Sequence, residues 1–250
     1  MLKQPMRRFG LIGKNLGHSF SKGYFEKKWA AAGLKDLAYE VYPLENKDSL
    51  QAFLSENNQI TGLNVTIPYK QVILEFIDLI SPEALEIGAV NCLYNENHQW
   101  VGYNTDGPAF LQTLTEFFGT RTITGVLILG TGGASKAVQW ALKKLGLTYN
   151  LVSSSGNGLN YEELDLNWDD SWNLVINTSP VGMYPASDLC PAIPYHRLNA
   201  NCLLYDLIYN PLETEFLKRG KLSGASFKNG LEMLYLQADM SWKIWNKDSK

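Results

Sequence analysis

The chain has 250 residues, of which 45% are hydrophobic and 19% charged, and its formal net charge is −3 at pH 7. This composition is typical of a globular protein of one large domain or two ordinary ones, and it offers no basic surface to a nucleic-acid partner. No run of 18 apolar residues is present, and residues 1–5 do not open an apolar targeting segment, so we expect a cytoplasmic protein without a membrane span.

The chain up to about residue 118 alternates between strand-like and helix-like segments. The helix expected at residues 21–33 carries Tyr24, Phe25 and Trp29 on one stripe, and Gly33 ends it. The other predicted elements are strands at 9–13, 38–44 and 62–67, helices at 47–56 and 108–118, and a hairpin over 89–104 that turns at 95–97.

A second series of elements begins at residues 126–129, an apolar run before a glycine that is typical of a strand buried on both faces. Helices are predicted at 136–145 and 231–245, and strands at 149–152, 174–176 and 203–208. Strands that alternate with helices predict an α/β fold with right-handed crossovers and mostly parallel sheets. We place the domain boundary near Asp106, with the last helix packing back on the first domain.

The cysteines do not form a motif. Cys92, Cys190 and Cys202 are odd in number and widely spaced, which favours three buried thiols in a reducing compartment over a disulfide framework or a zinc site. The three histidines are equally scattered, so we expect no metal site.

A glycine-rich loop, Gly130-Thr131-Gly132-Gly133-Ala134-Ser135, lies between a predicted strand and a predicted helix. Glycines there permit a tight turn and let backbone N–H groups approach a pyrophosphate at the positive end of the helix. Ser135 replaces the third glycine of the usual pattern, so the context carries the interpretation. We predict dinucleotide binding, and a purely structural turn is the alternative.

Cofactor choice is normally decided at the end of the next strand, where an acidic residue binds the ribose of NAD or an arginine the 2′-phosphate of NADP. Residues 153–157, Ser-Ser-Ser-Gly-Asn, carry neither. Their hydroxyls and amides can bind a phosphate weakly without a cation. An ordinary polar loop is the alternative.

Polar side chains gather where the strand at 62–67 ends. Asn64 and Thr66 share one face of that strand, and Pro68 takes the chain out of the sheet and leaves Lys70 at the start of a helix. A lysine in this place is usually solvated, so Lys70 alone is a weak candidate for catalysis.

Two further polar clusters precede helices. Asp106, in Asn104-Thr105-Asp106-Gly107, is by default a helix N-cap. Ser19 and Ser21, which follow the first strand, are also usual capping residues. Two serines near a helix start also suit a carboxylate, because hydroxyls and amides both donate to an anion.

Together these clusters resemble the shikimate dehydrogenase family, including its quinate/shikimate dehydrogenases. The motifs are His-Ser-x-Ser at 18–21, Asn-Val-Thr-x-Pro-x-Lys at 64–70, Gly-Ala-Val-Asn at 88–91, Asn-Thr-Asp-Gly at 104–107, Gly-x-Gly-Gly-Ala-Ser at 130–135 and Tyr-Asn-Pro-x-x-Thr at 209–214. Several are specific to the family, and the likeness spans residues 9 to about 242.

The resemblance implies a two-domain α/β fold with a cleft between the domains. A substrate-binding catalytic domain would comprise residues 1–105 and 231–250, with a mostly parallel sheet, and a Rossmann-type NAD(P)-binding domain residues 106–230. It also implies NADP-linked, reversible reduction of 3-dehydroshikimate to shikimate in aromatic amino-acid (chorismate) biosynthesis. The expected partners are therefore small molecules, with no nucleic acid or membrane, and the expected state is a monomer or homodimer.

By motif, the resemblance implies that Ser19 and Ser21 hold the substrate carboxylate and that Lys70 and Asp106 are the catalytic residues beside the reacting oxygen. Further substrate contacts are implied for Asn64, Thr66, Asn91, Tyr209 and Gln237. Cofactor contacts are implied for Gly130, Gly132, Gly133, Ala134, Ser135, Ser153, Ser154, Ser155, Thr178, Gly230 and Met233.

Reduction of a ketone produces an alkoxide that must be protonated, so a proton donor within hydrogen-bond reach is required. Lys70 as an ammonium group can stabilise the developing charge and pass a proton, while Asp106 holds the lysine and the substrate hydroxyl in line. Which of the two is the formal acid stays open at this point, because they can titrate as a pair.

The chain departs from the family at residues 153–155, where the family usually carries an arginine. The resemblance makes NADP the expected cofactor, and the missing arginine leaves NAD open as the alternative, as in an NAD-linked quinate/shikimate dehydrogenase. A non-catalytic dinucleotide sensor on this scaffold would be expected to lose Lys70 or Asp106, and both are present. Nothing in the sequence favours a structural interaction module.

Overall fold

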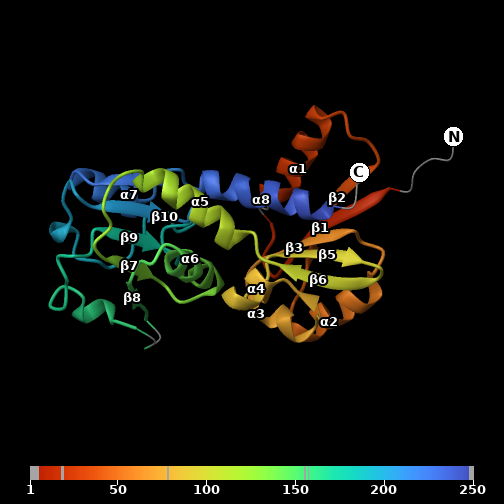
Figure 1. Cartoon of the computed structure of the whole chain (residues 1–250), viewed down its shortest axis with the longest axis horizontal. Coiled ribbons are helices and arrows are strands. Elements are labelled where there is room, and N and C mark those ends of the chain that lie inside the picture. Colours follow the sequence, from red (N-terminus) through yellow and green to blue (C-terminus); the bar gives the residue numbers. More distant parts are fainter. Residues whose placement is uncertain (1–5, 18–19, 78, 155, 157, 248–250) are drawn as a thin grey trace. The chain divides into compact units, whose positions relative to one another are not determined.

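The computed structural model describes residues 6–17, 20–77, 79–154, 156 and 158–247 (Figure 1). Ser19 and Ser155 lie outside the described residues. By their contacts the described residues form two compact units, one up to Thr105 together with the chain from Ala238 on, and one over Asp106–Gln237. Residues 231–237 thus belong with the second unit, whereas the sequence analysis assigned them to the first domain.

The first unit is built on a six-stranded sheet of order β2-β1-β3-β5-β6-β4. Only β5 among these strands runs against its neighbours, so the mostly parallel sheet predicted for this domain is confirmed. The strands are β1 (Arg7–Gly13), β2 (Leu37–Pro43), β3 (Gly62–Val65), β4 (Leu79–Ile80), β5 (Cys92–Glu96) and β6 (Gln99–Tyr103).

The turn of the β5–β6 hairpin is not where the sequence analysis placed it. Asn95 and Glu96 still belong to β5, and the turn lies at Asn97 and His98, whose φ angles are 51° and 66°. A two-residue hairpin turn of type I′ holds both central residues in the left-handed region, which asparagine tolerates better than most residues other than glycine. The predicted turn at 95–97 is therefore wrong in register.

The helices of the first unit are α1 (Phe20–Ala31), α2 (Lys47–Glu56), α3 (Tyr69–Val72), α4 (Pro82–Ile87) and the C-terminal half of α8 (Leu231–Trp245). The Asn46 side chain caps α2 in a reciprocal pair with Ser49, while Ser81 caps α4 and Gly88 ends it. The sequence analysis missed α4 and β4, which span only six and two residues and are too short to show a period.

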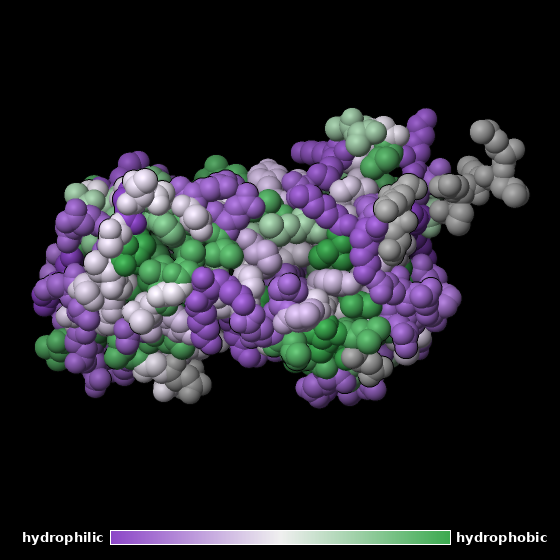
Figure 2. Space-filling model, viewed as in Figure 1, coloured by the Kyte–Doolittle hydropathy of each residue, from purple (hydrophilic) through white to green (hydrophobic). Residues whose placement is uncertain are grey.

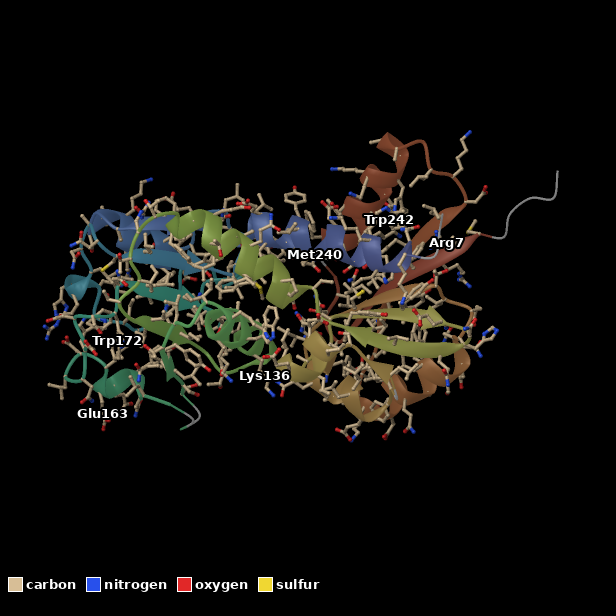
Figure 3. All side chains as sticks on the ribbon, in the orientation of Figure 1. Arg7, Lys136, Glu163, Trp172, Met240 and Trp242 are labelled. Carbon is tan, nitrogen blue, oxygen red and sulfur yellow. The ribbon has the colours of Figure 1, made fainter. Side chains whose placement is uncertain are left out.

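Aromatic packing fixes the end of α8 on this sheet. The Trp245 ring lies against Phe9 and Phe25, with ring centroids 5.0 and 5.3 Å away, and its Nε1 donates to the Leu93 carbonyl at 2.9 Å. A Cβ at Gly62 would lie 2.3 Å from the same indole nitrogen, so β3 needs glycine there. Met240 and Trp242, labelled in Figure 3, belong to this half of the helix.

The second unit contains a five-stranded sheet of order β11-β10-β9-β7-β8, and every pair in it is parallel. Its central strands are buried along their whole length, as expected of a parallel sheet covered on both faces. The elements are α5 (Asp106–Phe118), β7 (Val126–Leu129), α6 (Gly133–Lys144), β8 (Tyr149–Val152), β9 (Leu174–Asn177), β10 (Leu203–Asp206), α7 (Glu215–Leu222) and β11 (Ser226–Lys228).

On the face shown in Figure 2, hydrophilic residues cover much of each unit, with apolar residues visible between them. Within the described residues, no helix is long and apolar enough to cross a membrane. The cysteines are all free thiols, but Cys190 is partly exposed, so the expectation of three buried thiols is wrong for that residue.

Candidate functional site

The parallel strands of the second unit end together. Leu129 of β7 pairs with Val152 of β8 and Asn177 of β9, and Asn177 pairs with Asp206 of β10. The chain passes from β7 to β8 on one side and then to β9 on the other, so the strand order reverses at β7. Ligands of parallel α/β sheets bind beside the carboxyl ends of the strands at such a switch point.

The glycine loop lies at this switch point. Gly130 has a φ angle of +107°, and a Cβ there would lie 2.9 Å from Thr178 Oγ1, so both its backbone conformation and its surroundings require glycine. Helix α6 begins at Gly133 rather than at residue 136, with Gly132 as an N-cap that has no side-chain hydrogen bond and open space around its Cα. The first N–H groups of the helix have no partner within it, which suits a pyrophosphate.

Ser135, at the position of the third glycine, is fully buried, and its Oγ accepts a hydrogen bond from Gln139 Nε2 at 3.1 Å. Its side chain is thus shielded from solvent and hydrogen-bonded within α6. Ser153 is also buried, 3.5 Å from Thr131 Oγ1, whereas Ser154 is exposed. Lys136 lies in the first turn of α6 (Figure 3).

The remaining predicted cofactor residues follow β9 and β10. Thr178 donates to the Leu129 carbonyl through both its N–H, at 2.9 Å, and its Oγ1, at 2.8 Å. A Cβ at Gly230 would lie 2.1 Å from the Leu207 carbonyl oxygen, so close backbone packing alone requires glycine there. Met233 is buried.

A buried network of polar side chains occupies the end of β3 in the first unit. Asn64 Oδ1 accepts from the Tyr39 hydroxyl at 2.8 Å, and its Nδ2 donates to Ser241 Oγ at 3.0 Å. Tyr39 is also hydrogen-bonded to Ser21, and burial raises its pKa. Neither Tyr39 nor Ser241 was predicted, because one lies in an apolar strand and the other 177 residues from its partner Asn64.

Asn91 joins the same network. Its Oδ1 accepts from the Thr105 backbone N–H at 2.7 Å, and its Nδ2 donates to Thr105 Oγ1 at 2.9 Å. Thr105 Oγ1 in turn lies 3.3 Å from Ser241 Oγ. The structure therefore brings together Ser21, Asn64 and Asn91, three of the predicted substrate residues, around side chains whose hydrogen bonds fix both amides.

The other predicted residues of this group lie on separate elements. Lys70 is half-buried in α3, where its carbonyl accepts from Val90 N at 2.7 Å, and Thr66 is half-buried just before the turn into α3. Asp106 is 7% exposed and opens α5 in the second unit. Because Lys70 and Asp106 belong to different units, their pairing stays a prediction.

Two predicted substrate residues lie within the second unit. Burial raises the pKa of the half-buried Tyr209, and Gln237 Nε2 donates to the Leu234 carbonyl at 2.9 Å within α8. Their contacts with substrate stay predictions.

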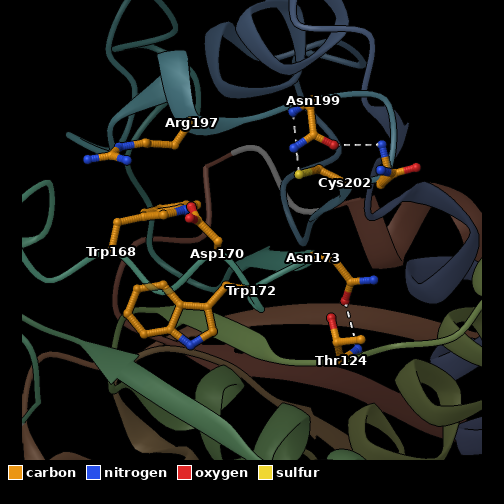
Figure 4. Close-up of a pocket in the computed structure, with 9 residues that line it drawn as sticks. Thr124, Trp168, Asp170, Trp172, Asn173, Arg197, Asn199 and Cys202 are labelled. Carbon is orange, nitrogen blue, oxygen red and sulfur yellow. Dashed lines mark hydrogen bonds between the residues drawn. The ribbon is translucent and has the colours of Figure 1, made fainter.

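A separate hollow of about 320 Å³ opens in the second unit beside Trp168 and Trp172 (Figure 4). It lies where β9 and β10 begin, at the edge of the sheet opposite the glycine loop. The amide of Asn173 that lines it accepts from Thr124 N at 2.9 Å, so it holds the adjoining loops. Among the residues described, no three histidine, cysteine or acidic side chains are grouped so as to hold a metal ion.

A parallel sheet with a glycine loop at its switch point, joined to a unit with a buried amide network, defines a nucleotide-binding α/β protein of the two-domain dehydrogenase type. The family model for the shikimate dehydrogenase substrate binding domain matches residues 11–93. A shikimate dehydrogenase (NADP(+)) of Methanococcus maripaludis is 36% identical, with 98% of this chain and 94% of that protein aligned. The chain belongs to the shikimate dehydrogenase family.

Solved structures agree with this assignment. Shikimate dehydrogenase 1 from Peptoclostridium difficile superposes with a TM-score of 0.86 at 33% identity, covering 98% of this chain and 93% of that one. The shikimate 5-dehydrogenase of Thermus thermophilus, in complex with NADP(H) and shikimate, gives a TM-score of 0.84 at 29% identity, covering 97% and 94%. The predicted fold class, with a Rossmann-type second domain, is confirmed.

Proposed function

We propose that the protein is an NADP-linked shikimate dehydrogenase, which interconverts 3-dehydroshikimate and shikimate. The observation that carries this proposal is the identity of about a third with enzymes of that name over nearly the whole chain, with the family's motif residues retained. The first unit would bind the substrate and the second the cofactor.

The residues around the glycine loop fit a dinucleotide. Gly130 permits the turn, and the uncapped start of α6 offers N–H groups to a pyrophosphate. The bound nicotinamide supplies a hydride to the substrate ketone or accepts one from the alcohol. Thr178 would hold the end of β7, and with it the start of the glycine loop, in place through its two hydrogen bonds to Leu129.

The buried network of the first unit would orient the substrate. Asn64 is fixed with Oδ1 toward Tyr39 and Nδ2 toward Ser241, which leaves one lone pair of Oδ1 for a substrate hydroxyl. Asn91 retains one N–H beyond its bonds to Thr105. Ser21, together with Ser19, would donate to the substrate carboxylate, with Thr66, Tyr209 and Gln237 as further contacts.

Lys70 and Asp106 would act on the reacting oxygen. The Lys70 ammonium group would donate a hydrogen bond to the oxygen as negative charge develops, and would pass a proton to it. Asp106 would accept from Lys70 and from the substrate hydroxyl, and so keep both in line.

The cofactor preference follows from the loop after β8. Exposed Ser154 and the helix start offer neutral donors, and Lys136 in the first turn of α6 is one cation that the phosphate would recruit. Neutral donors bind a phosphate less selectively than a bidentate arginine. We therefore expect NADP to be preferred, by a smaller margin than an arginine would provide.

Steady-state kinetics with shikimate and quinate, each with NADP and NAD, test the proposal. Turnover of shikimate with NADP is expected. Turnover of quinate with NAD alone would instead favour the NAD-linked quinate/shikimate enzyme, and binding of the dinucleotide without any turnover would indicate a sensor. We place the enzyme in the cytoplasm as a monomer or homodimer without a nucleic-acid partner, and its free thiols suit a reducing compartment.

A further inference from the structure

Asp206 is a fully buried carboxylate at the end of β10. Its Oδ1 accepts from Asn177 Nδ2 and from the Ile208 backbone N–H, both at 3.0 Å, and its Oδ2 accepts from Thr214 Oγ1 at 2.6 Å. Burial raises the pKa of this carboxyl to about 6, and the three hydrogen bonds act against that rise. The group is therefore ionised at neutral pH, and its three donors come from three different segments.

Asn177 links Asp206 to the turn that follows β9. Since its Nδ2 is held by the carboxylate, its Oδ1 faces Ser179 and accepts from Ser179 N at 3.1 Å and Ser179 Oγ at 2.7 Å. A flipped amide would place its donors against the Ser179 N–H and its oxygen against the carboxylate. Asp206 thus fixes the direction of this amide together with the Ser179 N–H and the Val181 carbonyl, which accepts from the same Nδ2 at 3.4 Å.

The turn held by Asn177 packs on the glycine loop. A Cβ at Gly130 would meet Thr178 Oγ1 at 2.9 Å and Ser179 N at 3.2 Å, so the two segments are in tight contact. Thr178 is bonded twice to the carbonyl of Leu129, the residue before Gly130. A displacement of the turn would therefore displace the first glycine of the loop.

We propose that Asp206 is a positioning residue for the dinucleotide: acting through Asn177, it holds the Thr178–Ser179 turn against Gly130 and so keeps the glycine loop in the shape that receives the pyrophosphate. This inference rests on the proposed function, since it requires a dinucleotide at that loop. Functional geometry must be held to within about 0.5 Å, which a hydrogen-bonded chain through a buried charge can do. Thr214, on the other carboxylate oxygen, instead caps α7 by accepting from Leu217 N.

The test is Asn177→Asp, which replaces the amide donor by a second carboxylate facing Asp206 and leaves an oxygen for Ser179. Direct titration of the purified full-length protein at pH 8 should show NADP bound about 10- to 100-fold more weakly, the usual effect of losing a hydrogen bond to a charged group. The KM for shikimate should change by less than about twofold. In the double variant Asn177→Asp/Asp206→Asn the donor and acceptor between the two side chains exchange places, while the Ile208 N–H, which used the same oxygen, loses its acceptor. NADP affinity should therefore recover in part relative to Asn177→Asp alone.

Thr214→Val is the matched control. It removes the donor to the other carboxylate oxygen and the cap of α7, so it should lower the melting temperature while leaving NADP affinity within about twofold of wild type. Equal loss of NADP affinity in the control, no loss in a folded Asn177→Asp protein, or no recovery in the double variant would each overturn the proposal.

If Asn177→Asp does not fold, Ser179→Ala decides the question. It deletes the hydroxyl that donates to Asn177 Oδ1 and should weaken NADP binding about three- to tenfold. An unchanged NADP affinity would contradict the proposal. Failure of the wild-type protein to bind NADP or NAD would remove the proposed function itself, a result distinct from any of these.

Discussion

The buried carboxyl of Asp206 should make the stability of the fold depend on pH in a direction opposite to that of a salt-bridged carboxylate. Burial raises its pKa from the ordinary 3.8 to about 6. Between these values the folded protein holds a proton that the unfolded chain has already lost. The stability that the neutral Asp206 carboxyl confers relative to its ionised form is therefore fully present below about pH 4 and disappears as the pH rises through about 6. At about 1.36 kcal/mol per pH unit, the full contribution is about 3 kcal/mol.

The measurement is the free energy of unfolding in urea for wild type and Asp206→Asn, from pH 4.5 to pH 7. Other carboxyl groups titrate in this range, and subtracting the variant's curve from that of wild type removes their contribution. The stability of wild type relative to the variant should fall by about 2 kcal/mol across the range, since part of the full effect lies below pH 4.5.

Asp188→Asn serves as the control, because it neutralises an exposed carboxyl in the same unit, where solvent screens the charge. Its difference curve should be nearly flat. A flat curve for Asp206→Asn as well would refute the reasoning, and so would one that rises with pH, because the native hydrogen bonds would then outweigh burial.

Three further predictions concern the proposed activity. Lys70→Ala and Asp106→Ala should each lower kcat by about 10²- to 10³-fold with little change in KM, and the double variant should be less than multiplicatively worse; near-normal turnover in either single variant would exclude the role. Ser19→Ala combined with Ser21→Ala should weaken shikimate binding, with each lost hydrogen bond to the carboxylate contributing about 1.5–3 kcal/mol, and should leave NADP binding unchanged in calorimetry. Ser154→Arg should tighten NADP selectively; if wild type already prefers NADP strongly and the substitution changes nothing, the phosphate binds elsewhere.

Elements with start and stop signals in their own sequence could be predicted to within a few residues. Residues 47–56, 149–152 and 231–245 match α2, β8 and α8 at both ends, because capping residues, glycines and apolar stripes mark these elements locally. Elements of a few residues, such as β11, have no period and form through sheet pairing with distant chain, which a local pattern does not contain.

The residues of the candidate site also fall into those that a local motif marks and those that it does not. Asn64, Asn91 and the glycine loop stand in local motifs, so the sequence marks them as candidates. The residues that support them stand in no such motif, because Tyr39 lies in a mostly apolar strand and Ser241 lies in the last helix of the chain. A hydrogen bond between residues 25 or 177 positions apart leaves no spacing to recognise.

Asp206 shows why such supports matter to function as well as to stability. An aspartate in a strand is ordinarily expected to face solvent, and only the β9–β10 pairing places Asp206, the last residue of β10, beside Asn177 inside the fold. A buried charge is costly unless donors surround it, and three donors surround the Asp206 carboxylate. The carboxylate orients the Asn177 amide, and through it the turn that packs on Gly130. Residues that bind the dinucleotide can therefore be predicted from their motif, whereas the residue that holds them in place becomes visible only when the strands are paired.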